Sequence, residues 1–79
     1  MDLGALRAVA DLLSAAERHG IGVTFVPDAE GWTIGYMVGN GGGDLVAGYN
    51  LTDTARAALR PLEDLAAQRE QARRERGQR

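Results

Sequence analysis

The sequence predicts an α+β domain of 79 residues in the order α-β-β-β-α, a three-stranded antiparallel meander with both helices packed on one face. Apolar residues recur at helical spacing near both ends of the chain. The middle third alternates in polarity, is rich in β-branched and aromatic residues, and is divided by Gly-rich turns too short for parallel crossovers. We expect one compact domain over residues 1–67, and a basic helical tail over residues 68–79 that frays or projects.

The first helix is expected over residues 2–19. Asp2 is a suitable N-cap, and Gly20 can take the left-handed conformation that ends a helix. His19 lies beside the negative end of the helix dipole, so we interpret it as structural rather than catalytic. The apolar residues at three- and four-residue spacing are expected to form the single buried stripe of this helix: Leu3, Leu6, Val9, Ala10, Leu13 and Ala16.

Three strands are predicted next, at Gly22–Pro27, Trp32–Val38 and Leu45–Leu51. The segment Gly39–Asp44 is expected to be a flexible hairpin loop, because four of its six residues are glycine. This loop leads into a strand rather than a helix, so a phosphate-binding interpretation lacks the helix N-terminus that it needs.

Alternation along the strands assigns the two faces of the sheet. The bulkier set is expected to face the helices: Val23, Phe25, Trp32, Ile34, Tyr36, Val38, Leu45, Ala47, Tyr49 and Leu51. The other set is expected to form an open face: Thr24, Val26, Thr33, Gly35, Met37, Val46, Gly48 and Asn50. This open face is small, half apolar and nearly uncharged, which is unlike an ordinary solvated sheet face.

The last third of the chain is predicted to be helical, with Thr52 or Asp53 as its cap. Because proline removes a hydrogen bond and clashes with the preceding turn, we expect a short helix over 53–60 and then a kink or a restart at Pro61. The apolar stripe ends near Ala67. The expected buried stripe of this helix is Ala55, Ala58, Leu59, Leu62 and Leu65.

The residue inventory argues against enzyme chemistry. The chain has no Cys and no Lys, one Ser (Ser14) and one His (His19), so nucleophilic triads, Schiff bases and thiolate metal sites lack their groups. The loop carboxylates Asp28, Glu30 and Asp44 are interpreted as solvated turn residues. We therefore expect no catalytic residues, no cofactor and no metal site.

Charge and hydropathy indicate the cellular location and the kind of organism from which the sequence comes. Nine acids and four Arg give residues 1–67 a charge of −5, whereas five Arg and two Glu give residues 68–79 a charge of +3. No apolar run approaches the ~20 residues of a membrane span, and the N-terminus lacks a basic leader, so we expect no membrane association and a cytoplasmic location. The exclusive use of Arg, with 13 Ala and 11 Gly, indicates a GC-rich bacterial or phage coding sequence.

The predicted element order is similar to that of the double-stranded RNA-binding domain. That family presents a Lys-rich cluster at the start of its second helix, where this chain has Thr52-Asp53-Thr54-Ala55-Arg56. Only Arg56 and Arg60 could contact phosphates there, and the body is acidic. The resemblance therefore stops at element order and does not assign the chain to that family.

The sequence predicts a non-enzymatic protein-interaction module that uses the open sheet face, either as a homodimer or by binding another protein. The alternative is a nucleic-acid-associated accessory protein that uses its C-terminal helix. The expected protein interface is Val26, Thr33, Gly35, Met37, Val46, Gly48 and Asn50. The expected nucleic-acid contacts are Arg69, Arg73, Arg74 and Arg76.

Overall fold

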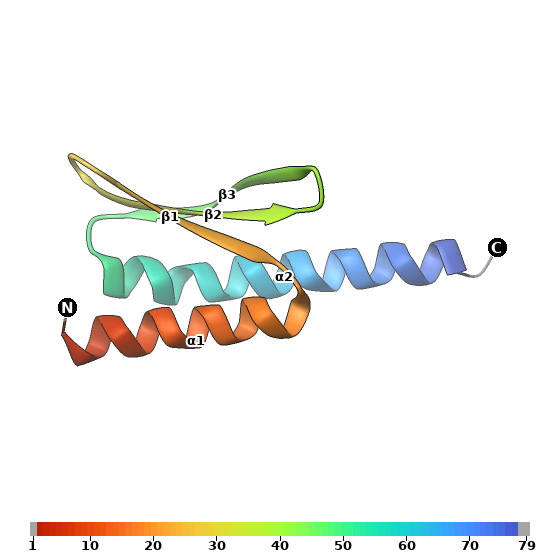
Figure 1. Cartoon of the computed structure of the whole chain (residues 1–79), viewed down its shortest axis with the longest axis horizontal. Coiled ribbons are helices and arrows are strands. Elements are labelled where there is room, and N and C mark those ends of the chain that lie inside the picture. The colour runs from red at the N-terminus through yellow and green to blue at the C-terminus, as the bar shows by residue number, and fades with distance from the viewer. Residues whose placement is uncertain (1, 78–79) are drawn as a thin grey trace.

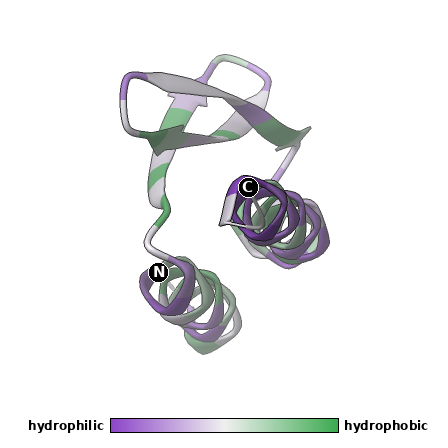
Figure 2. Cartoon of the chain, turned by 90° about the vertical axis from the view of Figure 1, so that its right-hand side faces the viewer, coloured by the Kyte–Doolittle hydropathy of each residue, from purple (hydrophilic) through white to green (hydrophobic). Residues whose placement is uncertain are grey.

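The computed structural model describes residues 2–77 and confirms the predicted fold class (Figure 1). The three strands pair antiparallel in the order β1-β2-β3. Both helices lie on the same side of the sheet (Figure 2). The second packs against β2 and β3, whereas the first packs mainly against the second and approaches the sheet along β1. In chain order the elements are α1 (Leu3–His19), β1 (Gly22–Asp28), β2 (Gly31–Val38), β3 (Gly41–Gly48) and α2 (Leu51–Gly77).

Both ends of α1 are capped by the residues that the sequence predicts. The Asp2 carboxylate accepts a hydrogen bond of 2.7 Å from the backbone N–H of Ala5. At the other end Gly20 is left-handed, with φ 65° and ψ 35°. The backbone N–H of Ile21 donates to the carbonyl of Ala16 over 3.0 Å, which turns the chain into β1.

The face of α1 that is buried differs from the prediction. Small residues make most of the contact with the core: Ala5, Ala8, Leu12, Ala15 and Ala16. Of the predicted stripe only Ala16 is buried and Val9 half-buried, whereas Leu3, Leu6, Ala10 and Leu13 are exposed. The single-stripe prediction is wrong because α1 has apolar residues on two sides, and the side with the smaller residues faces α2.

The hairpin between β2 and β3 is tighter than expected. Val38 pairs with Gly41, so the turn consists of Gly39 and Asn40 alone, and Gly39 has φ 55°. A glycine with positive φ at the first central position is typical of a type II′ turn, which matches the twist of the strands. The glycines that follow are strand residues paired with β2, so the prediction of a flexible loop over Gly39–Asp44 is wrong.

An irregularity in β3 reverses the predicted alternation. Ile34 pairs with Val46 but Gly35 pairs with Asp44, so Leu45 is the extra residue of a β-bulge. Both Leu45 and Val46 pack against the buried core. The strand then ends at Gly48 rather than Leu51. A bulge cannot be read from the alternation pattern, because the pattern assumes one residue per pairing position.

The bulge places several residues on the side opposite to the one expected. Val46 and Gly48 face the helices, and a Cβ at Gly48 would collide with the Thr54 side chain of α2. Ala47 is exposed, and Tyr49, beyond the end of β3, is 88% exposed. The predictions that Val46 and Gly48 point outward and that Ala47 and Tyr49 point inward are therefore wrong.

α2 begins two residues earlier than predicted and continues without a break through Pro61. Asn50 is its cap: the side-chain Oδ1 accepts a hydrogen bond of 2.8 Å from the backbone N–H of Asp53. Proline leaves the carbonyl of Ala57 without its helical donor. Ala57 is exposed, so water can satisfy that carbonyl, and buried Ala58 and Leu62 hold both halves of α2 on the same core.

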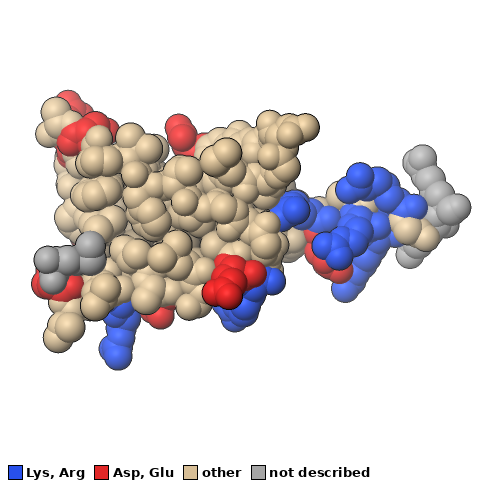
Figure 3. Space-filling view, in the orientation of Figure 1, with Lys and Arg blue, Asp and Glu red and all other residues tan. Residues whose placement is uncertain are grey.

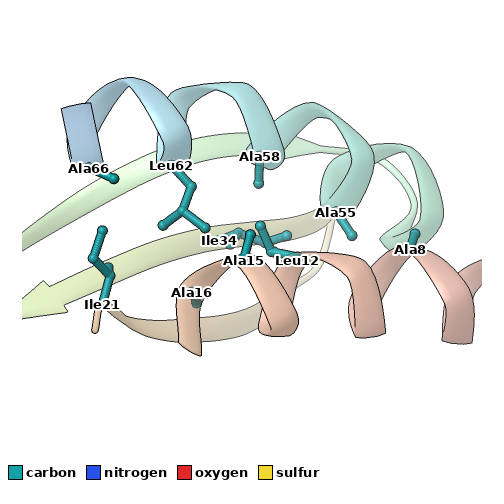
Figure 4. Close-up of a cluster of buried hydrophobic side chains, with 10 residues drawn as sticks. All are labelled: Ala8, Leu12, Ala15, Ala16, Ile21, Ile34, Ala55, Ala58, Leu62 and Ala66. Atoms are coloured by element: carbon teal, nitrogen blue, oxygen red, sulfur yellow. The ribbon is translucent and has the colours of Figure 1, made fainter. Parts of the chain in front are cut away.

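The core lies where α1, α2 and β2 meet (Figure 4). Its largest fully buried apolar side chains are Leu12, Ile34 and Leu62, one from each of these elements. Most of the other members are alanines on the facing sides of the two helices. Half-buried Val23, Phe25, Tyr36 and other apolar side chains surround this centre.

Candidate protein-interaction surfaces

The side of the sheet that faces away from the helices is a regular array of small residues, here called the outer sheet face. Strand pairing places its members in three rows. The rows are Gly22, Met37 and Gly42; Thr24, Gly35 and Asp44; and Val26, Thr33 and Ala47.

Two apolar side chains rise from the outer sheet face. Met37 is 58% exposed and Val26 is 54% exposed, at opposite ends of the array. Between them Gly35 is buried, and a Cβ there would lie 2.8 Å from both the Gly43 carbonyl oxygen and the Thr24 hydroxyl. The centre of the outer sheet face is therefore a shallow depression between two protruding apolar side chains. Only glycine fits at position 35, because a larger residue would collide with its neighbours.

The charges around this face all have one sign. Residues 22–48 contain three carboxylates, on Asp28, Glu30 and Asp44, and no Lys or Arg. Figure 3 shows acidic groups at the top of the molecule, over the sheet, a mixture of acidic and basic groups along its lower edge, and mainly basic groups along the projecting end of α2. Because no cation of the sheet neutralises these carboxylates, the rim of the face favours a basic partner surface.

A depression at one end of the sheet adds aromatic rings to this acidic rim. It is lined by Asp28, Glu30, Gly31, Trp32, Ala47, Gly48 and Tyr49. The Asp28 Oδ1 already accepts hydrogen bonds from the backbone N–H groups of Glu30 and Gly31, over 2.7 and 2.9 Å. Carboxylates beside Trp and Tyr rings form an environment that attracts cations. Tyr49 was missed as a surface residue because the regular alternation placed it inside.

Four of the seven predicted interface residues lie together on the outer sheet face: Val26, Thr33, Gly35 and Met37. The other three do not. Val46 and Gly48 lie on the helix side of the sheet, and Asn50 caps α2 beyond the end of β3.

A second apolar surface, not foreseen from the sequence, runs along α1. Leu3 is 83% exposed, Leu6 is 56% exposed and Leu13 is 45% exposed. Together with exposed Ala10 these residues form the α1 leucine stripe. The signal that could have found it is the presence of two apolar sets on α1, one rich in leucine and one rich in alanine.

The end of α2 carries arginines beyond the body. All residues from 67 to 77 are exposed. Arg69, Arg73 and Arg76 share the helix face that is buried earlier in α2. Arg69 Nη1 donates to the carbonyl of His19 over 3.4 Å, and Arg74 Nε lies 3.7 Å from Glu70 Oε1. The four predicted nucleic-acid contacts therefore lie on one projecting segment (Figure 3).

The one Ser and the one His of the chain do not face each other. Ser14 and His19 are five residues apart on α1, so helical geometry turns their side chains ~140° apart. Among residues 2–77 no group of three or more His, Cys, Asp or Glu side chains is placed to hold a metal ion. Within the same residues, neither helix combines the length and the apolar character required to cross a membrane. Comparison with protein-family models, curated proteins and solved structures gives no match.

Proposed function

We propose that this protein is a non-enzymatic interaction module that binds another protein through its outer sheet face. The observation that carries the proposal is the exposure of Met37 and Val26 on a face whose remaining positions are small and nearly uncharged. Surfaces of this kind pack closely against a partner, because no long solvated side chains need to be displaced.

The charge pattern selects the kind of partner. Contact between the outer sheet faces of two copies would bury two Asp44 carboxylates, and neither face carries a cation to pair with them. Such unpaired burial is costly. A different protein, with an apolar centre and Lys or Arg residues at its edge, would satisfy Asp44 and the acidic residues at the end of the sheet.

The test measures how two substitutions change binding of a captured partner. The immobilised chain is used for affinity capture, and the captured protein is then purified and titrated. Met37→Glu should weaken its binding at least tenfold, because a carboxylate would be buried without a cation. Asp44→Arg should weaken binding most at low salt, because it reverses a rim charge.

The matched control is Ala57→Glu, which adds the same charge at an exposed position of α2 away from the outer sheet face. It should bind as the original chain does. Equal affinity for the Met37→Glu variant would contradict the proposal. A change in the mass of the protein alone upon Met37→Glu, measured by light scattering, would show that the face binds a second copy instead.

A second candidate function is nucleic-acid binding by the end of α2. The observation that favours it is the projection of Arg69, Arg73 and Arg76 from one helix face beyond the body. Residues 67–77 span roughly 16 Å of helix, which is enough to reach several phosphates.

Fluorescence anisotropy with a labelled 20-base-pair DNA and the corresponding RNA duplex tests this candidate. Binding should weaken steeply as salt rises, and Arg73→Gln with Arg76→Gln should lower the salt dependence. Truncation after Ala67 should abolish binding. Retained binding after this truncation would reject the tail as the contact.

A further inference from the structure

The depression at the end of the sheet, here called the Tyr49 depression, lies between the turn that joins β1 to β2 and the end of β3. The carboxylates of Asp28 and Glu30 and the aromatic rings of Trp32 and Tyr49 line it. Its volume of about 300 Å³ is at the lower limit of ligand sites, so it suits one side chain rather than a whole cofactor. Figure 3 shows acidic groups at the upper left, where this turn lies in Figure 1.

The turn between β1 and β2 fixes the position of the Asp28 carboxylate. Its Oδ1 accepts the two hydrogen bonds from the backbone N–H groups of Glu30 and Gly31 that close the turn. Among the described residues no hydrogen bond involves its second oxygen, Oδ2. One carboxylate oxygen is therefore held in place and still able to accept a hydrogen bond from a ligand.

Close backbone contact brings Tyr49 to this turn. Gly31 has φ 152°, and a Cβ there would collide with the Gly48 carbonyl oxygen and lie 2.8 Å from the Tyr49 Cα. Only glycine allows β2 to begin so near the end of β3. Tyr49 itself is 88% exposed, so its ring packs against little of the single chain. An exposed aromatic ring beside a depression is typical of a binding hot spot.

The charged groups that line the Tyr49 depression are all carboxylates. Residues 20–55 contain four Asp or Glu residues and no Lys or Arg. Arg56, the next cation along the chain, lines a separate depression beside the first turn of α1. The nearest positive helix end, the N-terminus of α2, is covered by its cap Asn50 and by Asp53. Among the described residues the one ion pair within 4.0 Å lies near the end of α2, so neither carboxylate of the depression has a cationic partner.

A guanidinium group matches this lining better than an ammonium group does. Its plane can stack on the ring of Tyr49 while its N–H groups donate, in that plane, to carboxylate oxygens of Asp28 and Glu30. An ammonium group is a compact charge without a flat face, so it cannot stack on a ring and donate sideways in the same way. Carboxylates and rings placed together therefore favour an arginine side chain as the occupant.

We propose that the Tyr49 depression binds one arginine side chain of the protein partner. This inference rests on the proposed function, because the arginine belongs to the protein that covers the outer sheet face. Ala47 lines the depression and also belongs to the row that Val26 and Thr33 form on that face, so one partner surface can reach both. The arginine fixes the position of the partner at this end of the sheet.

The first test titrates the full chain with N-acetyl-arginine methylamide at constant ionic strength. Trp32 is the only tryptophan of the chain, so its indole N–H resonance reports on the depression directly. This resonance should shift along a saturating curve at probe concentrations up to ~100 mM, since a few contacts of this kind give affinities in the millimolar range.

Two further probes test the chemistry of recognition. N-acetyl-citrulline methylamide has nearly the same shape without the charge and should give no saturating shift. N-acetyl-lysine methylamide keeps the charge without the plane and should bind about threefold more weakly or worse. No saturating shift with the arginine probe, or an equal affinity for either of the other two, would overturn the proposal.

Substitutions locate the bound probe. Tyr49→Leu removes an exposed ring and Glu30→Gln removes an exposed charge, so circular dichroism should show the original fold in both. Each should raise the dissociation constant of the arginine probe about threefold or more. The matched control is Asp44→Asn, which removes a carboxylate outside the depression and should leave the affinity nearly unchanged. An equal loss in Asp44→Asn, or no loss in the other two variants, would reject the depression as the site.

Titration with the captured partner separates this inference from the proposed function. Met37→Glu should bind the arginine probe as the original chain does, because Met37 lies at the other end of the outer sheet face. Both Met37→Glu and Tyr49→Leu should weaken binding of the partner. If only Met37→Glu does so, the inference fails while the proposed function stands. If only Tyr49→Leu does so, the partner binds at the depression and the proposed function of the outer sheet face fails.

Discussion

The two apolar sides of α1 differ in residue size and in what they contact. The side against α2 is built mainly from alanines, with Leu12 as its one large residue. The opposite side carries three leucines and is exposed. If apolar surface area alone decided which side is buried, the leucine side of α1 would pack on the core.

The difference shows that the shape of the neighbouring element decides which side is buried. α2 also faces α1 largely through alanines, among them Ala55, Ala58 and Ala66. Two alanine-rich helix faces approach closely, and the distance between helix axes depends on the side chains at the contact. The leucines of α1 are too large to fit between the two helices, so they stay exposed and form a second apolar surface.

The largest expected effect comes from breaking the buried side of α1. Leu12→Ala should lower the free energy of unfolding by ~2–5 kcal/mol, because Leu12 is fully buried and the cavity cannot collapse completely. Leu6→Ala should change the free energy of unfolding by no more than ~0.5 kcal/mol, because Leu6 is exposed. Urea denaturation of both variants checks the contrast. Equal losses would mean that the leucine side also packs within the single chain.

A smaller effect is expected at the contact between β3 and α2. Gly48→Ala should lower the free energy of unfolding by ~1–3 kcal/mol, because the added methyl group meets the Thr54 side chain. Gly41→Ala is the matched control, since its nearest neighbour would be at an ordinary 3.8 Å. Thermal unfolding should separate the two variants. A harmless Gly48→Ala would indicate that Gly48 points outward after all.

The N-caps of the two helices should contribute about equally to the free energy of unfolding. Asn50→Ala and Asp2→Ala each remove a side-chain acceptor from a helix N-terminus, at a cost of ~1 kcal/mol. Asp53→Ala retains the bond from the backbone N–H of residue 53 to Asn50, so it should cost less. Chemical denaturation distinguishes Asn50 from Asp53 as the cap of α2. A larger loss for Asp53→Ala would reverse that assignment.

The smallest effect is expected from removing the end of α2. The described residues that truncation after Ala67 deletes, 68–77, are all exposed, and the truncation also removes the hydrogen bond from Arg69 to His19. Exposed contacts of this kind contribute well under 1 kcal/mol, so Tm should fall by less than ~4 °C. Differential scanning calorimetry measures this change in Tm. A fall of 10 °C or more would show that the basic segment packs on the body or on a second copy.

Features that depend on short segments were predictable from the sequence. The caps of α1, the order of five elements and the antiparallel pairing follow from Asp2, Gly20 and the short turns, because these act within a few residues. Five of the eight residues predicted on the open sheet face were also placed correctly, all of them in β1 and β2, because these two strands alternate regularly. Pro61 was misjudged because its cost as an isolated helix breaker is offset by packing on both sides of it.

The sequence by itself determined where helices and strands occur, because spacing, caps and turns are local properties of the chain. Only the tertiary structure decided which surfaces stay exposed. The bulge at Leu45 shifted the faces of β3, and the fit between two alanine-rich helix faces left the leucines of α1 outside. Both outcomes depend on how residues distant in sequence fit together, and close packing is a property of the whole assembly rather than of any one element.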